Sequence, residues 1–314
     1  MRGNCDLRHA FLCAVNPVTE FSPAKLNLYL AITGRRADGY HDLVSVAAPL
    51  DFGDELTVTA TAAGFTLACN DPAVPVDGTN LVIKAAQAFV AATGWKGGAA
   101  FRLTKRIPVG AGLGGGSSNA VAALRALNRL SGGALTGAKL AGVAAALGSD
   151  CPLFLHDAPV VMRGRGERIE PVSASAAARL RGRRVLLFKP GFGISTAWAY
   201  ARMAASSAKA SGGGPAVYLP APEAEGKLAA WMQGSGPAEE LLANNMEGVA
   251  FEKYVALPVL LAGLRREFGA VPRLSGSGSA CFALLRDDLA APSLRAAIRA
   301  AWGPPAFVQE ARLT

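Results

Sequence analysis

The sequence reads Ile107-Pro108-Val109-Gly110-Ala111-Gly112-Leu113-Gly114-Gly115-Gly116-Ser117-Ser118-Asn119-Ala120, a glycine-rich stretch that runs into two serines and then into a helical pattern. Such a loop exposes backbone N–H groups, and the amino end of a helix attracts negative charge. Ser117 or Ser118 can cap the helix or turn a hydroxyl toward a phosphate oxygen or a metal ion. We call residues 107–118 the glycine loop. We predict that it binds phosphate, because a flexible linker, the alternative, would not lead at once into a periodic helix.

Positive charge surrounds this loop in the sequence. No Asp or Glu occurs between Asp77 and Asp150, whereas the same stretch contains Lys84, Lys96, Arg102, Lys105, Arg106, Arg125, Arg129 and Lys139. A stretch that carries only positive charge concentrates anions. Its basic residues are dispersed among apolar residues, which favours a small anionic ligand over a nucleic-acid surface. The net charge of +9 for the whole chain fits a nucleotide, a nucleic acid or an acidic membrane and does not choose among them.

Length and cysteine usage narrow the class of protein. A chain of 314 residues is typical of two domains. The five cysteines are scattered without a C-x-x-C pair, which indicates neither a disulfide framework nor a zinc site and favours a reducing, cytoplasmic location. No apolar run is long enough for a membrane span, and we expect residues 1–20 to form a disordered extension rather than a signal peptide.

Hydrophobic periodicity predicts an α+β chain. We expect strands at residues 23–30, 55–60, 65–68, 100–104, 160–162, 184–188 and 306–310, with helices at 80–92, after the glycine loop, up to 147, at 257–268 and at 292–301. A small-residue turn at 274–279 should lead into a further apolar strand. In the first strand, alternation places Leu26, Leu28 and Leu30 on one face and Lys25, Asn27 and Tyr29 on the other.

Common phosphate-binding motifs do not explain the glycine loop. The Walker A pattern and the protein-kinase motifs are absent. Gly110, Gly112 and Gly115 satisfy the dinucleotide pattern G-x-G-x-x-G. However, Pro108 interrupts the strand that should precede it, and no acidic residue follows at the distance needed to bind a ribose.

The pattern P-x-x-x-G-L-G-G-G-S-S-N-A resembles the phosphate loop of the GHMP kinases, the superfamily of galactokinase, homoserine kinase and mevalonate kinase. Residues 23–28 and 274–279 are similar to the amino-terminal and carboxy-terminal motifs of that superfamily. The resemblance implies a two-domain α+β GHMP kinase fold, with a nucleotide-binding domain at 21–170, a ferredoxin-like domain at 171–314 and a cleft between them. It also implies ATP as the phosphate donor.

Further segments resemble one branch of these kinases. They are residues 32–41 with Asp38-Gly39-Tyr40-His41, Asn80-Leu81-Val82, residues 148–152, and Lys189-Pro190-Gly191 with Ile194-Ser195-Thr196. In that branch the acceptor is a small alcohol of the non-mevalonate isoprenoid pathway that carries a cytidine diphosphate group, and its 2-hydroxyl is phosphorylated. One departure is Asn245, where the branch usually has Asp, which removes any role for charge at this position.

Two alternatives stay open beside this kinase. One is another GHMP kinase, acting on homoserine or a mevalonate derivative, whose acceptor would present no cytosine to Tyr40 and His41. The other is a non-catalytic RNA-binding protein, which the presence of both Lys25 and Asp150 argues against. We expect a small-molecule substrate, no nucleic acid, no membrane, and a monomer or weak homodimer.

The resemblance gives the catalytic roles to Asp150 and Lys25. From local sequence, Asp150 is equally a helix cap, and Lys25 is a solvent-facing strand residue. As implied by the resemblance, Asp150 accepts the hydroxyl proton, while Lys25 keeps Asp150 ionised and polarises the hydroxyl.

The remaining site residues divide between donor and acceptor. Those expected at ATP are Pro108, Val109, Gly110, Ala111, Gly112, Leu113, Gly114, Gly115, Gly116, Ser117 and Ser118, with Lys105 and Asn80, although Lys105 is equally a solvated strand-end residue and Asn80 a helix cap. Those expected at the substrate are Asn27, Tyr40, His41, Asp150, Tyr200, Gly276 and Ser277, with Tyr40 and Tyr200 stacking on the base. We expect Mg²⁺ to be held mainly by phosphates and water, with no dedicated set of protein ligands.

Overall fold

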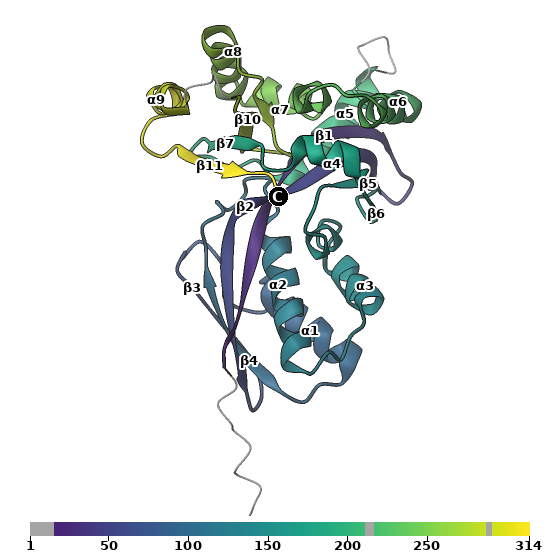
Figure 1. Ribbon diagram of the computed structural model, residues 1–314, viewed down its shortest axis with the longest axis vertical. Coiled ribbons are helices and arrows are strands. Elements are labelled where there is room, and N and C mark those ends of the chain that lie inside the picture. The colour runs from purple at the N-terminus through teal and green to yellow at the C-terminus, as the bar shows by residue number, and fades with distance from the viewer. Residues whose placement is uncertain (1–15, 211–216, 287–290) are drawn as a thin grey trace, which may run out of the picture.

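The computed structural model describes residues 16–210, 217–286 and 291–314, and it contains two β-sheets with helices packed around them (Figure 1). This arrangement confirms the predicted α+β class. The first sheet has the strand order β3-β4-β2-β1-β8, with β5 paired to β2 and β6 to β5. Its strands are β1 (Val18–Arg35), β2 (His41–Thr61), β3 (Phe65–Cys69), β4 (Gly98–Thr104), β5 (Val160–Gly164), β6 (Arg168–Pro171) and β8 (Ala243–Asn244).

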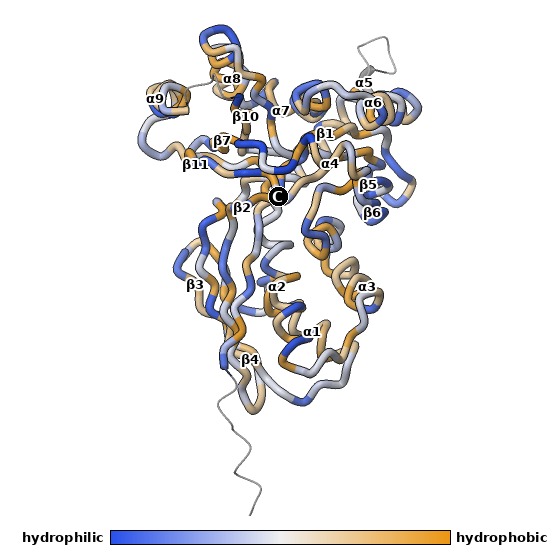
Figure 2. The backbone as a smooth tube through the Cα atoms, in the orientation of Figure 1, coloured by the Kyte–Doolittle hydropathy of each residue, from blue (hydrophilic) through white to orange (hydrophobic). Residues whose placement is uncertain are grey.

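Helices α1 (Leu81–Thr93), α2 (Gly115–Leu130) and α3 (Gly137–Leu147) gather on one side of this sheet (Figure 1). Helix α2 lies against β1, β2 and α1, and it buries Val121, Leu124 and Leu127 as its periodicity predicts. Phe101 and Leu103 of strand β4 are buried in the same core. Hydrophilic and hydrophobic residues alternate along the neighbouring strands (Figure 2). Apolar contact between α2 and the sheet therefore fixes where the glycine loop ends.

The second sheet has the order β11-β7-β10-β9 and lies at the other end of the molecule (Figure 1). Its strands are β7 (Arg184–Lys189), β9 (Arg273–Leu274), β10 (Cys281–Leu284) and β11 (Phe307–Arg312). The helices of this half are α4 (Ala174–Leu180), α5 (Thr196–Ala210), α6 (Ala221–Gln233), η3 (Ala238–Leu241), α7 (Glu247–Lys253), α8 (Ala256–Phe268) and α9 (Ala291–Trp302), whereas the short helix η2 (Pro152–Leu155) packs against α2 and α3. Strand β8 comes from this half of the chain but pairs in parallel with β1. The division into domains at residue 170 stays a prediction.

Strand β1 departs from the predicted alternation. The pairing of β1 with β2 shifts register between Asn27 and Tyr29, as at a β-bulge. Tyr29 therefore packs with Leu26 and Leu28 in one core, while Leu30 packs in the other. The prediction that Leu30 shares the face of Leu26 and that Tyr29 shares the face of Lys25 is wrong, because the extra residue of the bulge reverses the faces beyond it.

The strand also begins earlier than expected. Val18–Arg35 is continuous strand, so residues 18–20 belong to β1 and not to a disordered extension. Residues 1–15 lie outside the described part of the chain. Among the described helices, none is both long and apolar enough to cross a lipid bilayer.

Candidate active site

A cavity of about 1190 Å³ lies where three motifs meet: residues 23–28, the glycine loop and the turn at residues 274–279. Its lining includes Lys25, Asn27, Tyr40, His41, Asn80, Lys105, Pro108, Val109, Gly110, Ala111, Gly112, Leu113, Gly114, Gly115, Gly116, Ser117, Asp150, Tyr200, Gly276 and Ser277. Apart from Ser118, every residue that the sequence assigned to the site is therefore brought to one cavity. These residues come from segments far apart in the chain: β1, the start of β2, the start of α1, the end of β4, the glycine loop, the turn after α3, α5 and the turn before β10.

Backbone hydrogen bonds join these motifs around the glycine loop. The N–H of Lys25 donates to the carbonyl of Leu113 at 3.0 Å, and the N–H of Ala280 donates to the carbonyl of Ala111 at 3.0 Å. Gly112 has φ +76°, and a Cβ at this position would lie 2.4 Å from the carbonyl oxygen of Ser275. Only glycine allows this left-handed conformation and this close approach together.

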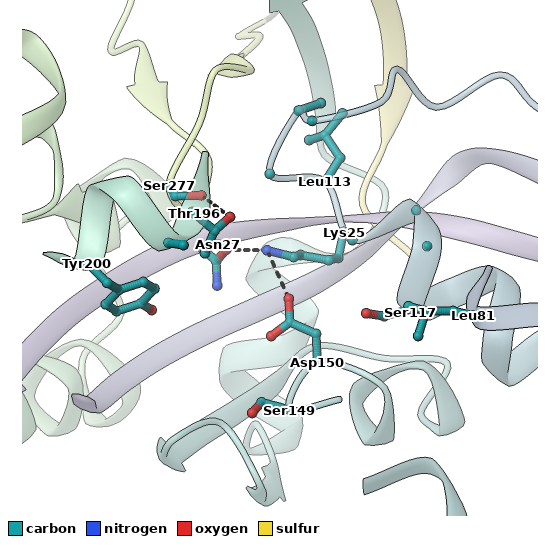
Figure 3. A pocket seen from close by; sticks show the side chains of 18 of the residues that line it. Lys25, Asn27, Leu81, Leu113, Ser117, Ser149, Asp150, Thr196, Tyr200 and Ser277 are labelled. Atoms are coloured by element: carbon teal, nitrogen blue, oxygen red, sulfur yellow. Dashed lines mark hydrogen bonds and ion pairs between the residues drawn. The ribbon is translucent and has the colours of Figure 1, made fainter. Parts of the chain in front are cut away.

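The amino end of α2 leaves its first amides available. Gly114, at φ 74°, is the N-cap and provides no side-chain cap, so Gly115, Gly116 and Ser117 supply N–H groups that have no carbonyl acceptor in a preceding turn. These residues line the cavity, and Ser117 points into it (Figure 3). The arrangement fits a phosphate at the positive end of the helix.

Ser118 is a correction to the sequence interpretation. Its N–H donates to the carbonyl of Gly114 at 2.9 Å, and its hydroxyl accepts a hydrogen bond from Ser22 at 2.8 Å. The side chain is buried away from the cavity, because consecutive residues of a helix point about 100° apart around its axis. Neither serine caps α2.

Lys25 lies between two oxygen-bearing side chains (Figure 3). Its Nζ is 2.5 Å from Asn27 Oδ1 and 3.8 Å from Asp150 Oδ2, and the Lys25 side chain is only 5% exposed, whereas Asp150 is 44% exposed to the cavity. Burial lowers the pKa of Lys25, and the Asp150 carboxylate opposes that shift. The pair thus presents an accessible carboxylate held beside a buried ammonium.

Lys105 is neither solvated nor unpaired. Its Nζ lies 2.5 Å from Oδ2 of Asp54, a fully buried carboxylate of β2. Asp54 also accepts hydrogen bonds from the N–H groups of Arg106 and Ile107 and from the side chain of Asn119. Asp54 lies outside the stretch between Asp77 and Asp150 that contains no acidic residue. Its carboxylate neutralises Lys105, and its bonds to the two backbone N–H groups hold the start of the glycine loop.

The basic stretch as a whole is less free than its sequence indicated. Arg125 pairs with Asp157, and Arg129 pairs with Glu20. Of the basic residues between Asp77 and Asp150, Lys105 is the one that lines the cavity in the described part of the chain. The lysine that stands beside Asp150 comes instead from β1.

Asn80 caps helix α1, which is one of the two roles that the sequence predicted for it. Its Oδ1 accepts from the N–H of Val82 at 2.8 Å, and its Nδ2 donates to the carbonyl of Pro75 at 2.6 Å. These bonds fix the start of α1 at the edge of the cavity. A contact between Asn80 and a nucleotide stays a prediction.

Aromatic rings line the cavity on the side away from the glycine loop. The rings of His41 and Tyr200 lie 5.0 Å apart, and Arg165 lies over the Tyr40 ring at 4.7 Å. His41 is buried, whereas Tyr40 is 54% exposed. Burial and the nearby Arg35 lower the pKa of His41, which favours the neutral imidazole. These rings and guanidinium groups suit a planar base attached to an anionic chain.

The turn before β10 forms the remaining wall. Ser277 shares a 2.8 Å hydrogen bond with Thr196 of α5 (Figure 3), and Gly276 approaches Lys25 and Asn27 closely. Asn244 of β8 donates to the carbonyls of Leu274 and Gly276 and so holds the turn in place. Among the residues that the structure describes, no group of three His, Cys, Asp or Glu side chains could hold a metal ion.

Comparison with known proteins agrees with this geometry. Residues 80–158 match the model of the GHMP kinases N terminal domain. A 4-diphosphocytidyl-2-C-methyl-D-erythritol kinase of Methylacidiphilum infernorum is 39% identical over 275 residues, which cover 87% of this chain and 88% of that protein. The chain belongs to the 4-diphosphocytidyl-2-C-methyl-D-erythritol kinase family. The kinase of the same name from Salinibacter ruber is 36% identical over 88% of this chain and 92% of its own length.

Solved structures support membership in this kinase family. A crystal structure of 4-(cytidine 5'-diphospho)-2C-methyl-D-erythritol kinase matches with a TM-score of 0.73 at 33% identity, over 95% of this chain and all of that one. Mevalonate kinase of Methanococcus jannaschii matches with a TM-score of 0.70 at 12% identity, over 96% of this chain and 99% of its own, which shows a shared fold. The GHMP kinase fold predicted from the motifs is therefore confirmed.

Several residues at the family site were missed by sequence reasoning. Asp54, Arg165, Thr196 and Tyr218 contact predicted site residues. Asp54 gave no signal, because a single acid in a strand usually faces solvent. Arg165 follows a glycine in a turn, and nothing in its local pattern links it to Tyr40.

Proposed function

We propose that this protein transfers the γ-phosphate of ATP to the 2-hydroxyl of 4-diphosphocytidyl-2-C-methyl-D-erythritol, in the non-mevalonate isoprenoid pathway. The observation that carries the proposal is the Lys25–Asp150 pair, which lies in one cavity between the glycine loop and the aromatic rings. The cavity volume, about 1190 Å³, exceeds the roughly 300–1,000 Å³ of a site for one drug-sized ligand. Donor and acceptor therefore have room side by side.

ATP binds with its phosphates at the amino end of α2. The free amides of residues 115–117 and the helix dipole hold the phosphate oxygens, and the apolar side chains of Val74, Leu81 and Val109 offer a surface to the adenine. The Ser117 hydroxyl is the protein group best placed to join phosphates and water around Mg²⁺. When bound, the ion neutralises phosphate charge that develops during transfer.

Transfer takes place beside Asp150. The acceptor oxygen forms a bond to the γ-phosphorus while the bond from that phosphorus to the β–γ bridging oxygen breaks, and ADP leaves. The hydroxyl proton passes to the Asp150 carboxylate. Lys25, held by Asn27 at 2.5 Å, places a positive charge 3.8 Å from that carboxylate and polarises the hydroxyl. Asp150 suits the role of base because its side chain faces the cavity, whereas Lys25 is buried.

The cytidine end occupies the aromatic side. Tyr40 and Tyr200 stack on the base, and His41 bonds its edge. Gly276, Ser277 and Asn27 lie near the acceptor and the diphosphate. The Lys25 ammonium lies beside Asn27 and Gly276, so the alcohol reaches the Lys25–Asp150 pair from the aromatic side of the cavity.

A direct test mixes the protein with ATP, Mg²⁺ and separate alcohols and measures ADP. We expect ADP with 4-diphosphocytidyl-2-C-methyl-D-erythritol and none with homoserine or mevalonate. Asp150→Asn should reduce kcat by about 10²–10⁴-fold while ATP binding, measured by calorimetry, stays within about twofold. Asp157→Asn, at an exposed ion pair outside the cavity, is the matched control and should leave kcat unchanged.

The proposal would fail if homoserine released ADP and the cytidine substrate did not, or if Asp150→Asn kept near-normal turnover. The expected monomer or weak homodimer in the cytoplasm, acting without nucleic acid or membrane, stays a prediction. Light scattering of the purified protein and its retention on RNA at physiological salt check the oligomeric state and the RNA alternative.

A further inference from the structure

Asn245, which directly follows β8, makes a set of hydrogen bonds that aspartate cannot make. Its Oδ1 accepts from the N–H of Ile32 at 2.9 Å, and its Nδ2 donates to the carbonyls of Ile32 at 2.9 Å and of Val217 at 3.2 Å. The orientation of the amide is fixed, because the Ile32 N–H is a donor and needs the oxygen. An ionised aspartate would accept from Ile32 but would turn its second oxygen toward two carbonyl oxygens.

These bonds hold the segment that follows α5 against β1. Val217 is tied through Asn245, and the N–H of Leu219 donates directly to the carbonyl of Ile32 at 3.1 Å. Tyr218 lies between these two attachment points. The backbone on both sides of Tyr218 is therefore fixed to the strand that carries Lys25 and Asn27.

Tyr218 in turn contacts the histidine of the aromatic cluster. Its hydroxyl lies 3.1 Å from Nε2 of His41, with the two rings 5.8 Å apart. His41 lines the cavity, is 7% exposed and also packs against Tyr200. A hydrogen bond to one ring nitrogen fixes how the imidazole ring is turned, whichever nitrogen carries the proton, because the tyrosine hydroxyl can donate or accept.

We propose that Asn245 is a positioning residue for recognition of the cytosine base: it holds Tyr218, which fixes the orientation of the His41 ring. The proposal rests on the function proposed above. A hydrogen bond to the edge of the base needs donor and acceptor in line, so a His41 ring that rotates would lose this contact for part of the time. The contact lies on the base side of the cavity, away from the amides of α2, so it acts on the acceptor and not on ATP.

Steady-state kinetics test this role. Asn245→Asp and Tyr218→Phe are each expected to raise KM for the cytidine substrate roughly tenfold, while KM for ATP and kcat stay within about twofold. The double variant should be no worse than either single variant, because both act through the same contact. The rise in KM for the cytidine substrate that Asn245→Asp causes should be smaller at low pH, because a protonated carboxyl group can again donate one hydrogen bond.

Asn128→Asp is the matched control. Asn128 also bonds both the N–H and the carbonyl of one residue, Leu135, but it does so in the turn after α2. This variant should lose stability without changing KM for the cytidine substrate. An equal rise in that KM would show that loosening any such turn is sufficient, and it would overturn the proposal.

Nitrogen NMR of the imidazole ring gives a readout that needs no substrate and that a purely structural role would not move. We expect the chemical shift of His41 Nε2, which reports its hydrogen bond, to change in both Tyr218→Phe and Asn245→Asp, with the signal assigned by its loss in His41→Gln. An unchanged Nε2 shift in both variants would refute the proposal even in an active kinase. If the wild-type protein fails to phosphorylate the cytidine substrate while the Nε2 shift responds, the proposed function fails and the positioning of His41 stands.

Discussion

Replacing Asp54 with asparagine should expose how much the glycine loop depends on one buried carboxylate. Oδ1 of Asp54 accepts two backbone N–H groups, from Arg106 and Ile107, and Oδ2 accepts from Lys105 and Asn119. An asparagine oxygen can keep the two backbone bonds. Its NH₂ group would then face the Lys105 ammonium and the Asn119 amide, which are both donors.

The size of the loss follows from burial. Asp54 is fully buried and the Lys105 side chain is 7% exposed, so water cannot replace the lost carboxylate. Removing one partner of a buried ion pair costs about 3–5 kcal/mol, because the other charge stays buried and unpaired. We therefore expect Asp54→Asn to lower the free energy of unfolding by about 3–5 kcal/mol, a large part of the roughly 5–15 kcal/mol of a typical domain.

Urea unfolding followed by tryptophan fluorescence and circular dichroism measures this change. The double variant Asp54→Asn with Lys105→Met should recover part of the loss, because it also removes the unpaired ammonium. Asp157→Asn, whose carboxylate is 87% exposed beside Arg125, should change stability by no more than about 0.5 kcal/mol. A loss under about 1 kcal/mol in Asp54→Asn, or no recovery in the double variant, would refute the reasoning.

Three further predictions concern the catalytic cavity. Burial lowers the pKa of Lys25 below its ordinary value of 10.5, so kcat/KM should fall as the pH rises through a value below 10.5; a pH profile checks this, and a limb at or above 10.5 contradicts it. Gly112→Ala should raise KM for ATP at least about tenfold and cost roughly 1–3 kcal/mol of stability, because its Cβ would meet the Ser275 carbonyl; unchanged ATP kinetics would argue against this close approach. EDTA should stop ADP release and added Mg²⁺ should restore it, whereas turnover that persists without divalent cations would exclude a need for the ion.

Local sequence was sufficient for several elements of the fold. The glycine loop and the periodic residues after it predicted α2, and Asn80 marked the start of α1, because caps, glycines and apolar spacing act within a few residues. The structure begins α1 at Leu81 and α2 at Gly115. Helices α4 to α7 were not predicted, since their short apolar stripes differ little from loop sequence.

The strands show where local pattern stops being informative. Strand β1 was predicted as residues 23–30 but runs from Val18 to Arg35, because its ends are held by pairing with β2 and not by their own residues. The bulge between Asn27 and Tyr29 is likewise a property of the pair of strands. It allows Lys25 and Asn27 to face the cavity while Tyr29 packs into a core.

The sequence alone was enough to reveal a phosphate-binding loop, the candidate catalytic residues Lys25 and Asp150, and a kinase family, because these signals lie in short contiguous motifs. Folding alone brought Lys25 to within 3.8 Å of Asp150, paired Lys105 with Asp54 and turned Ser118 away from the cavity. It also placed Tyr218 on His41, across 177 positions of sequence. Such partners are chosen by burial and by the need of each buried polar group for a hydrogen bond, and neither is visible until the strands and helices have packed.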